Sequence, residues 1–128
     1  MYIQKYERSD KMKILFVCSA NCNRSIAFER EFKKLIIKSK KFEDWEVRSC
    51  GIWYGYPYQL NKKLMEWADI VYVMDLSHKV WINKHFLKHL HKVKVIGISD
   101  QYDVDDVELQ ELFNYWIKLE NIDELNPD

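Results

Sequence analysis

A cysteine and an arginine separated by five residues form the first pair in this chain whose spacing suggests chemistry. Cys18, Arg24 and Ser25 belong to the segment Cys-Ser-Ala-Asn-Cys-Asn-Arg-Ser, which follows an apolar run at residues 13–17 and precedes a helix-like segment. Backbone N–H groups of a short loop at a helix N-terminus can surround an anion and would favour the thiolate form of Cys18. Ser25 could donate a hydrogen bond to the sulfur, and Arg24 could bind two phosphate oxygens. The pattern predicts a nucleophile directed at phosphorus.

Four short runs of apolar and β-branched residues are predicted to be β-strands. They are residues 13–17, 45–49, 70–74 and 93–96. The first and third runs are continuously apolar, as strands covered on both faces require, so they are expected inside a sheet. The second and fourth runs alternate between apolar and polar residues, which places them nearer the sheet edges.

Segments with apolar residues at helical spacing lie between and after these strands. They are residues 25–39, 59–68, 77–90 and 107–119. Helices between strands imply right-handed crossovers and a parallel sheet, so we predict a three-layer α/β fold. Functional loops of such a sheet lie at the carboxyl ends of its strands. Four segments are therefore expected to meet at one edge: residues 18–25, 50–58, 75–78 and 97–105.

The length and composition fit one domain. A chain of 128 residues with 48% apolar residues can bury a core without disulfides or metals. We expect a single domain over residues 1–128, with its core at about 12–119 and loose ends at 1–11 and 121–128. Only three glycines are present, and the glycine-rich nucleotide loops are absent. The cysteine loop must curl without glycine, so Asn21 is expected to adopt a left-handed backbone conformation.

Charge and hydropathy argue against several classes of protein. The formal net charge is zero, which argues against a nucleic-acid or membrane-surface binder. The charges are unevenly divided: residues 1–99 carry 19 basic and 10 acidic side chains, and residues 100–128 carry 1 and 10. Neither a membrane-spanning run nor a signal peptide is evident. Three cysteines do not suggest a disulfide framework, so we expect a cytoplasmic protein.

Two histidines are the remaining candidates for a metal site. His85 and His89 lie one turn apart on the predicted third helix, but no third ligand accompanies them. We therefore expect no metal and no other cofactor.

The residues around the cysteine loop resemble a known family. Residues 13–28 are similar to the opening of the low-molecular-weight protein tyrosine phosphatases, whose loop follows the first strand. Further matches lie at residues 48–51, 67–70, 73–75 and 98–102, the last of these where the family has its Asp-Pro-Tyr loop. The similarity covers roughly residues 12–118 and is closest to the short, compact members. It implies a four-stranded parallel sheet with strand order 2-1-3-4.

The resemblance implies a two-step hydrolysis of a phosphomonoester. Cys18 would attack phosphorus and form a phosphocysteine, and Asp100 would protonate the leaving oxygen and then activate water. Asp103, Asp105 and Asp106 are rival acids near that loop. The phosphate-binding residues would be Ser19, Ala20, Asn21, Cys22, Asn23 and Arg24, through the loop amides and the guanidinium.

The resemblance also implies supporting residues. Asn21, Ser25 and Ser49 match positions that hydrogen-bond together and brace the loop. Trp53 and Tyr102 are expected to form aromatic walls against a flat aryl phosphate, with Tyr54 and Tyr56 as competitors for that role.

Departures from the family pattern lie in both loops. Ala20 replaces a frequent glycine, and Gln101 replaces the proline of the acid loop. Cys22 lies four residues after Cys18, where many members have a second cysteine at five. A reversible Cys18–Cys22 disulfide is a hypothesis that peptide mapping after peroxide treatment tests.

The expected activity is that of a protein tyrosine phosphatase, acting on a phosphorylated protein or a small aryl phosphate and releasing inorganic phosphate. Three alternatives use the same loop: an arsenate reductase, a serine phosphatase of the RNA polymerase tail type, and a phosphate-binding regulator without turnover. Arsenate reductases relay electrons through further cysteines, and only Cys22 and Cys50 are available here. The tail phosphatase has a closely similar loop but added elements for which this chain is short. The regulator is disfavoured because every catalytic position is filled.

Overall fold

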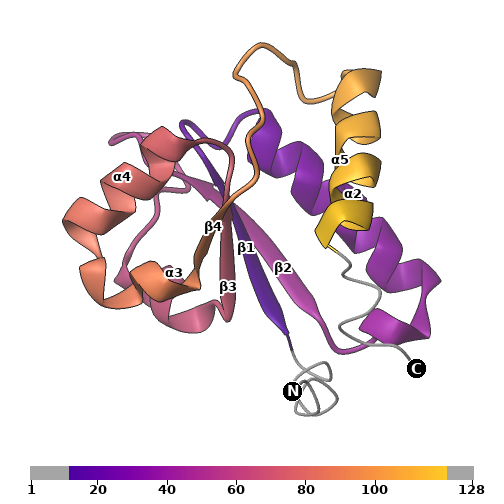
Figure 1. Ribbon diagram of the computed structural model, residues 1–128, viewed down its shortest axis with the longest axis horizontal. Helices are drawn as coiled ribbons and strands as arrows, with labels where there is room; N and C mark the ends of the chain where they lie inside the picture. The colour runs from indigo at the N-terminus through magenta and orange to yellow at the C-terminus, as the bar shows by residue number, and fades with distance from the viewer. Residues whose placement is uncertain (1–11, 121–128) are drawn as a thin grey trace.

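The computed structural model of the protein describes residues 12–120 (Figure 1). The strands are β1 (Lys13–Cys18), β2 (Glu46–Gly51), β3 (Ile70–Val73) and β4 (Val93–Val95). The α-helices are α2 (Arg24–Lys38), α3 (Lys62–Trp67), α4 (Leu76–His85) and α5 (Val107–Glu120), and the 3-10 helices are η1 (Lys40–Phe42) and η2 (Leu87–Lys92). The termini expected to be loose, 1–11 and 121–128, lie outside the described residues.

The four strands form one parallel sheet in the order β2-β1-β3-β4. This confirms the predicted α/β class and the strand order that the family resemblance implied. It also confirms that the two continuously apolar runs, now β1 and β3, lie inside the sheet, and that the two alternating runs form its edges.

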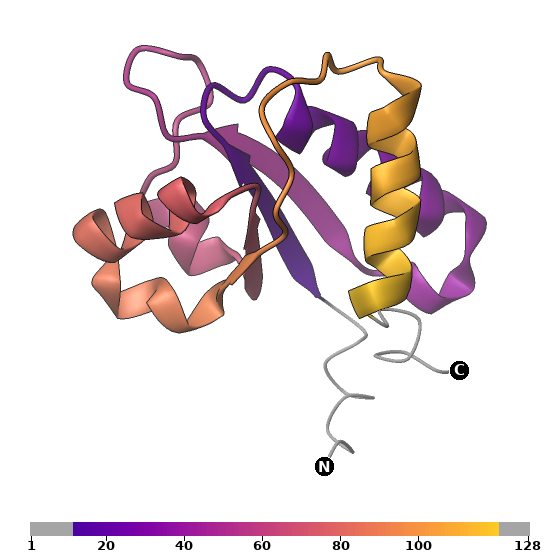
Figure 2. The same cartoon turned by 45° about the horizontal axis from the view of Figure 1, so that its top comes forward.

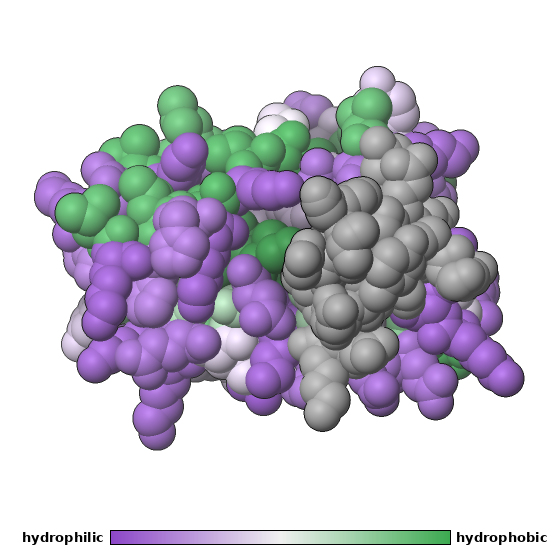
Figure 3. Space-filling view, turned by 60° about the horizontal axis from the view of Figure 1, so that its bottom comes forward, coloured by the Kyte–Doolittle hydropathy of each residue, from purple (hydrophilic) through white to green (hydrophobic). Residues whose placement is uncertain are grey.

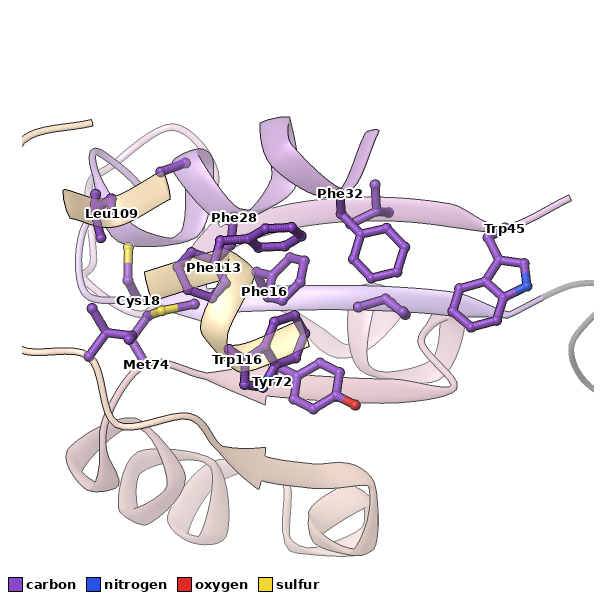
Figure 4. Packing of buried hydrophobic residues seen from close by; sticks show 14 of the residues in the cluster. Phe16, Cys18, Phe28, Phe32, Trp45, Tyr72, Met74, Leu109, Phe113 and Trp116 are labelled. Carbon is purple, nitrogen blue, oxygen red and sulfur yellow. The ribbon is translucent and has the colours of Figure 1, made fainter. Parts of the chain in front are cut away.

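Helices α2 and α5 cover one face of the sheet and enclose an aromatic core (Figure 1). Phe16 of β1 packs against Phe28 of α2 and Trp116 of α5, with ring centroids 5.7 and 5.6 Å away. Figure 4 shows Cys18 at one end of this core and Trp45 at the other. The loop that follows Cys18 therefore begins directly on a packed, rigid layer.

Helices α3 and α4 cover the other face, where Leu15 and Val17 of β1 pack with Met65 and Ile82. Figure 3 shows hydrophobic side chains gathered on the side of the molecule that carries these helices, while hydrophilic side chains cover much of the rest of that view. Within residues 12–120, no helix combines the length and the apolar character that crossing a membrane requires.

Two predicted helices differ from the observed ones for local reasons. Helix α3 begins at Lys62, three residues later than predicted, because the Asn61 side chain accepts a hydrogen bond from the Leu64 N–H and caps the helix there. The predicted helix 77–90 is broken at Phe86, whose backbone leaves the α-region (φ −140°, ψ 50°). Its continuation is the separate 3-10 helix η2, so apolar spacing alone did not reveal the break.

Candidate active site

The four segments expected at one sheet edge meet there, with the loops after β1, β2 and β4 gathered at the top of Figure 2. The Ser19 carbonyl accepts hydrogen bonds from the backbone N–H groups of Ile52 and Trp53, which tie the segment after β2 to the cysteine loop. Arg24 donates to the Ile98 carbonyl, and the Ser19 hydroxyl contacts His78. Contacts between all four segments confirm the geometric prediction.

The cysteine loop joins β1 to α2. Cys18 is the last residue of β1 and is 3% exposed, and Arg24 is the first residue of α2. Among the described residues, the backbone N–H groups of residues 20–23 donate to no protein acceptor. Buried or partly buried N–H groups are normally paired, so this row of donors at a helix N-terminus is suited to an anion.

Asn21 has φ +57°, and among the described residues it is the only non-glycine residue with positive φ. This confirms that Asn21 supplies the left-handed bend that the loop needs in place of glycine. A second close approach is made by Gly51 of β2, which pairs with Cys18. A Cβ at Gly51 would lie 2.6 Å from the Ser19 carbonyl oxygen and 2.7 Å from the Asn21 nitrogen, so the loop packs on a position that excludes side chains.

A chain of hydrogen bonds leads from the sulfur of Cys18 to α2. Cys18 Sγ lies 3.0 Å from the Ser25 hydroxyl, which accepts from Asn21 Nδ2 at 2.8 Å. Ser25 can donate its proton to the sulfur or, at the longer distance of 3.5 Å, to the Cys50 carbonyl. Asn21 Nδ2 also donates to Ser49 Oγ at 3.0 Å, and the Ser49 hydroxyl donates to the Glu29 carboxylate. Asn21, Ser25 and Ser49, which were expected to brace the loop, thus lie together. Glu29 was not among the expected residues, and it is the last member of this series of hydrogen bonds.

Arg24 is held almost completely out of solvent, with 2% of its side chain exposed. Its Nη1 donates to Asp75 Oδ2 and to the Ile98 carbonyl, each at 2.9 Å. Its Nη2 lies 3.4 Å from Ser19 Oγ and 3.5 Å from Asp100 Oδ1. Partial burial acts to raise the pKa of Asp75, but hydrogen bonds from Ser77 and Arg24 outweigh it and lower that pKa to about 2. Asp75 therefore stays ionised and orients the guanidinium.

His78 is fully buried beside this pair. Its Nδ1 accepts from the Asp75 backbone N–H at 3.1 Å, so in the neutral ring the proton is on Nε2, which lies 3.1 Å from Ser19 Oγ. Burial lowers the pKa of His78 to about 4, with the Arg24 charge acting in the same direction and Asp75 and Asp100 opposing it. Ser19 then accepts hydrogen bonds from its neighbours and keeps its own proton for a group bound in the loop.

A hollow of about 240 Å³ opens above the cysteine loop. Its lining residues are Cys18, Ser19, Ala20, Cys22, Asn23, Arg24, Trp53, Tyr56 and Asp100. The Asn21 side chain does not line the hollow, because it is turned to Ser25 and Ser49. Its expected phosphate contact is through the backbone N–H, which is among the unpaired loop donors, and stays a prediction.

Asp100 is the carboxylate that lines this hollow, and its side chain is 64% exposed. The rival acids lie elsewhere: Asp105 contacts Arg30, and Asp106 accepts from the Asp103 backbone N–H. The Asn23 side chain accepts from the Val104 N–H at 2.8 Å and anchors the segment that carries Asp100 to the cysteine loop.

The aromatic walls differ from the expectation at one position. Trp53 lines the hollow as expected, and its partner is Tyr56, with ring centroids 5.7 Å apart. Tyr102 is half-buried and packs against the aromatic core instead, because its segment turns toward α5. Tyr54 is 92% exposed and lies outside the hollow.

All three cysteines are free thiols, in different surroundings. Cys22 is exposed and lines the hollow with Cys18, and a disulfide between them stays a prediction. Cys50 is fully buried, and burial, together with the nearby Cys18, raises the pKa of its thiol. Cys50 is therefore a packing residue.

Asp75 and His78 are the functional candidates that the sequence analysis missed as individual residues. Both lie in the segment 75–78 predicted at the site edge. The sequence signal that could have found them is Asp at an N-cap with His three residues later, which forms a reciprocal capping pair at the start of α4.

No family model matches the sequence, and no curated protein matches it. Solved structures do match over most of the chain. YfkJ from Bacillus subtilis is 20% identical, with a TM-score of 0.70, over 91% of this chain and 98% of that one. A YwlE mutant from B. subtilis is 25% identical, with a TM-score of 0.66, over 86% and 99%. A low molecular weight protein tyrosine phosphatase from T. tengcongensis is 21% identical, with a TM-score of 0.64, over 87% and 96%.

These neighbours span nearly their whole lengths in the match, so the likeness covers a complete domain of each. Their TM-scores of 0.64 to 0.70 show that the overall fold is shared. Over most of its length, the chain has the fold of the low molecular weight protein tyrosine phosphatases and the YwlE-type arginine phosphatases.

Proposed function

We propose that this protein is a cysteine-dependent phosphomonoesterase that hydrolyses aryl phosphates, with phosphotyrosine in proteins as its main target. The observation that carries the proposal is one hollow that holds a buried cysteine, a buried arginine and an exposed aspartate, at the end of a loop with free backbone N–H groups. The same fold occurs in the tyrosine phosphatase Wzb from Escherichia coli K30, which was solved in complex with phosphate.

In the proposed reaction, Cys18 Sγ attacks phosphorus, a sulfur–phosphorus bond forms and the ester oxygen–phosphorus bond breaks. Asp100 gives its proton to the leaving oxygen. Water then attacks phosphorus and gives a proton to Asp100, so that a new oxygen–phosphorus bond forms and the sulfur–phosphorus bond breaks. Inorganic phosphate leaves, and Cys18 is again a thiolate. Arg24 Nη2, the Ser19 hydroxyl and the loop N–H groups stabilise the charge on the transferred phosphoryl group.

Each surrounding group supports one part of this cycle. Ser25 donates to the sulfur and stabilises the thiolate, and Asp75 holds the guanidinium in place. Trp53 and Tyr56 flank the hollow, which favours a flat aryl ester over a short alkyl one. A thiol relay for arsenate reduction has less support, because Cys50 is buried beneath the loop.

The test is hydrolysis of para-nitrophenyl phosphate by the wild type, Cys18→Ser and the matched variant Cys22→Ser. We expect turnover in the wild type and in Cys22→Ser, and none in Cys18→Ser. Rapid acid quenching should trap a phosphoryl group on the peptide that contains Cys18. An inactive wild type, or full activity in Cys18→Ser, would refute the proposal.

A second pair of substrates tests which phosphorylated amino acid the enzyme prefers. One neighbour is described as the YwlE arginine phosphatase. We expect higher kcat/KM for a phosphotyrosine peptide than for the same peptide with phosphoarginine, and the reverse order would assign the enzyme to phosphoarginine.

A further inference from the structure

A second, larger hollow lies beside the Cys18 hollow, between the segment after β2 and helix α4. Its volume is about 970 Å³, and it is a shallow depression, widely open to solvent. We call it the aromatic groove, after the side chains that dominate its lining: Trp53, Tyr54, Tyr56, Trp81, His85 and Phe86.

The aromatic groove is continuous with the proposed active site. Trp53 and Tyr56 line both hollows, so a molecule long enough to extend past these two residues from a phosphate over Cys18 can reach the groove. Trp53 is 48% exposed and Tyr56 is 43% exposed, and Tyr54 in the same segment is 92% exposed. Exposed aromatic side chains gathered at one place are typical of interaction surfaces.

The wall of the groove on α4 is held in place by its own contacts. Trp81 stacks on His85, with centroids 4.1 Å apart and planes inclined by 19°, and His85 Nδ1 donates to the Trp81 carbonyl at 2.9 Å. The ring centroid of Phe86 lies 5.8 Å from that of Trp81. A wall that is already ordered loses little conformational entropy when an apolar group binds it.

The charged residues that line the groove affect which kinds of side chain it can bind. Among the described residues that line it, Lys62 and His85 are able to carry a positive charge and none is acidic. Its surface therefore suits apolar and aromatic side chains and tolerates acidic ones, whereas a basic side chain would find no carboxylate in the lining and would compete with Lys62 and His85 for the aromatic faces.

We propose that the aromatic groove binds the residues that flank the phosphorylated side chain of a protein substrate, with an apolar or aromatic residue seated against Trp81. This inference rests on the proposed function and extends it from aryl phosphates in general to phosphoproteins. A small aryl phosphate would fill the Cys18 hollow and leave the groove empty. An extended peptide advances about 3.3 Å per residue, so a residue within a few positions of the phosphate reaches the groove.

The test uses phosphotyrosine peptides in which a single Leu is moved through each flanking position of an otherwise alanine and serine sequence. We expect kcat/KM to rise roughly tenfold at one position over the peptide without Leu, as burial of one leucine side chain provides. Replacing that Leu with Lys should abolish the gain.

Trp81→Ala tests the groove itself through the ratio of kcat/KM for the best Leu peptide to kcat/KM for para-nitrophenyl phosphate. That ratio should fall severalfold, and Tyr54→Ala, at a fully accessible position, should lower it in the same direction. Tyr58→Ala is the matched control, because Tyr58 belongs to the same segment but lines a separate hollow beside α2. The control should keep the wild-type ratio.

The absence of a Leu gain, or a gain that survives in both Trp81→Ala and Tyr54→Ala, overturns the groove proposal and leaves the phosphatase proposal standing. A wild type that hydrolyses no phosphate ester overturns the proposed function instead. The dissociation constants of the same peptides for Cys18→Ser then decide the groove, since binding needs no turnover: tighter binding of the Leu peptide supports it, and equal binding overturns it.

Discussion

Arg24 Nη1 lies 2.9 Å from Asp75 Oδ2, and this contact joins the first residue of α2 to the residue that caps α4. The guanidinium is 2% exposed, whereas the carboxylate is 38% exposed. Asp100, at 3.5 Å from Nη2, also compensates the charge, but Asp75 makes the shorter, hydrogen-bonded contact and so contributes most to the orientation of the guanidinium.

Asp75→Asn is therefore expected to lower both stability and turnover. The loss of a charge-assisted hydrogen bond to a partly exposed partner should reduce the free energy of unfolding by about 1–3 kcal/mol. A misoriented Arg24 should lower kcat by roughly tenfold or more. Urea unfolding and steady-state kinetics measure the two effects, with the exposed Asp103→Asn as control. Wild-type kcat in Asp75→Asn would show that Arg24 needs no orienting carboxylate.

Asp100→Asn should lower kcat by about 10²-fold, because the leaving oxygen would depart without a proton. The loss should be greater for phenyl phosphate than for para-nitrophenyl phosphate, whose leaving group is the weaker base. Asp105→Asn is the matched control, since Asp105 contacts Arg30 outside the hollow. Equal losses with both substrates would assign Asp100 to positioning rather than proton transfer.

Two substitutions at Asn21 separate its backbone role from its side-chain role. Asn21→Gly keeps the left-handed conformation and loses the hydrogen bonds to Ser25 and Ser49, so activity should fall. Asn21→Ala also strains the backbone and should unfold about 1 kcal/mol more easily than Asn21→Gly. Thermal unfolding of the two variants measures the difference, and equal stabilities would argue against strain at this position.

Gly51→Ala, a substitution in β2, should disrupt the neighbouring cysteine loop that follows β1. The added methyl group would meet the backbone of residues 19–21 at 2.6–2.8 Å, and backbone atoms cannot move aside as a flexible side chain can. We expect weaker binding of inorganic phosphate and a kcat/KM at least roughly tenfold lower. Titration with phosphate checks this directly, and an unchanged dissociation constant would contradict it.

His78 predicts a pH dependence of stability. Its pKa falls from 6.5 to about 4 on folding, so between these values the unfolded chain binds more protons than the folded one. Stability should therefore decrease as pH falls from about 6.5 to 4, by on the order of 3 kcal/mol at most. Protonation also turns Nδ1 into a donor facing the Asp75 N–H, which breaks that hydrogen bond.

The measurement is the free energy of unfolding across this pH range for the wild type, His78→Gln and the exposed control His91→Gln. The decrease should be much smaller in His78→Gln, which has no titrating group at this position, and unchanged in His91→Gln. Parallel curves for all three proteins would place the titrating group elsewhere.

The elements and the centre of the site could be predicted because their signals are local. Cys18 and Arg24 are fixed by the spacing within one loop, and Asn21 is the residue in that loop that best tolerates a left-handed bend. The continuous runs of apolar residues made β1 and β3 recognisable as strands that are covered on both faces. The order of the strands came from the family resemblance, since apolar patterning alone does not order them.

The remaining parts depend on contacts between segments that are distant in the sequence. Asp75 and His78 act on the cysteine loop from more than fifty residues away, and their roles follow from the pairing of β1 with β3. Tyr56 rather than Tyr102 stands beside Trp53 because the paths of two loops decide which aromatic ring reaches the hollow. The break at Phe86 is invisible to hydrophobic spacing, which continues through it.

The segment after β2 is closed on itself by main-chain contacts. Gly51 N–H donates to the Tyr58 carbonyl, Leu60 N–H donates to the Gly51 carbonyl, and the Ile52 and Trp53 N–H groups bind Ser19. None of these bonds involves a side chain, so side chains within residues 53–58 can change without shifting Cys18, except at Gly55, whose φ of +89° disfavours other residues. Under the proposed function, substrate preference could therefore change in evolution, or be engineered, through the side chains of this segment while the backbone around Cys18 stays the same.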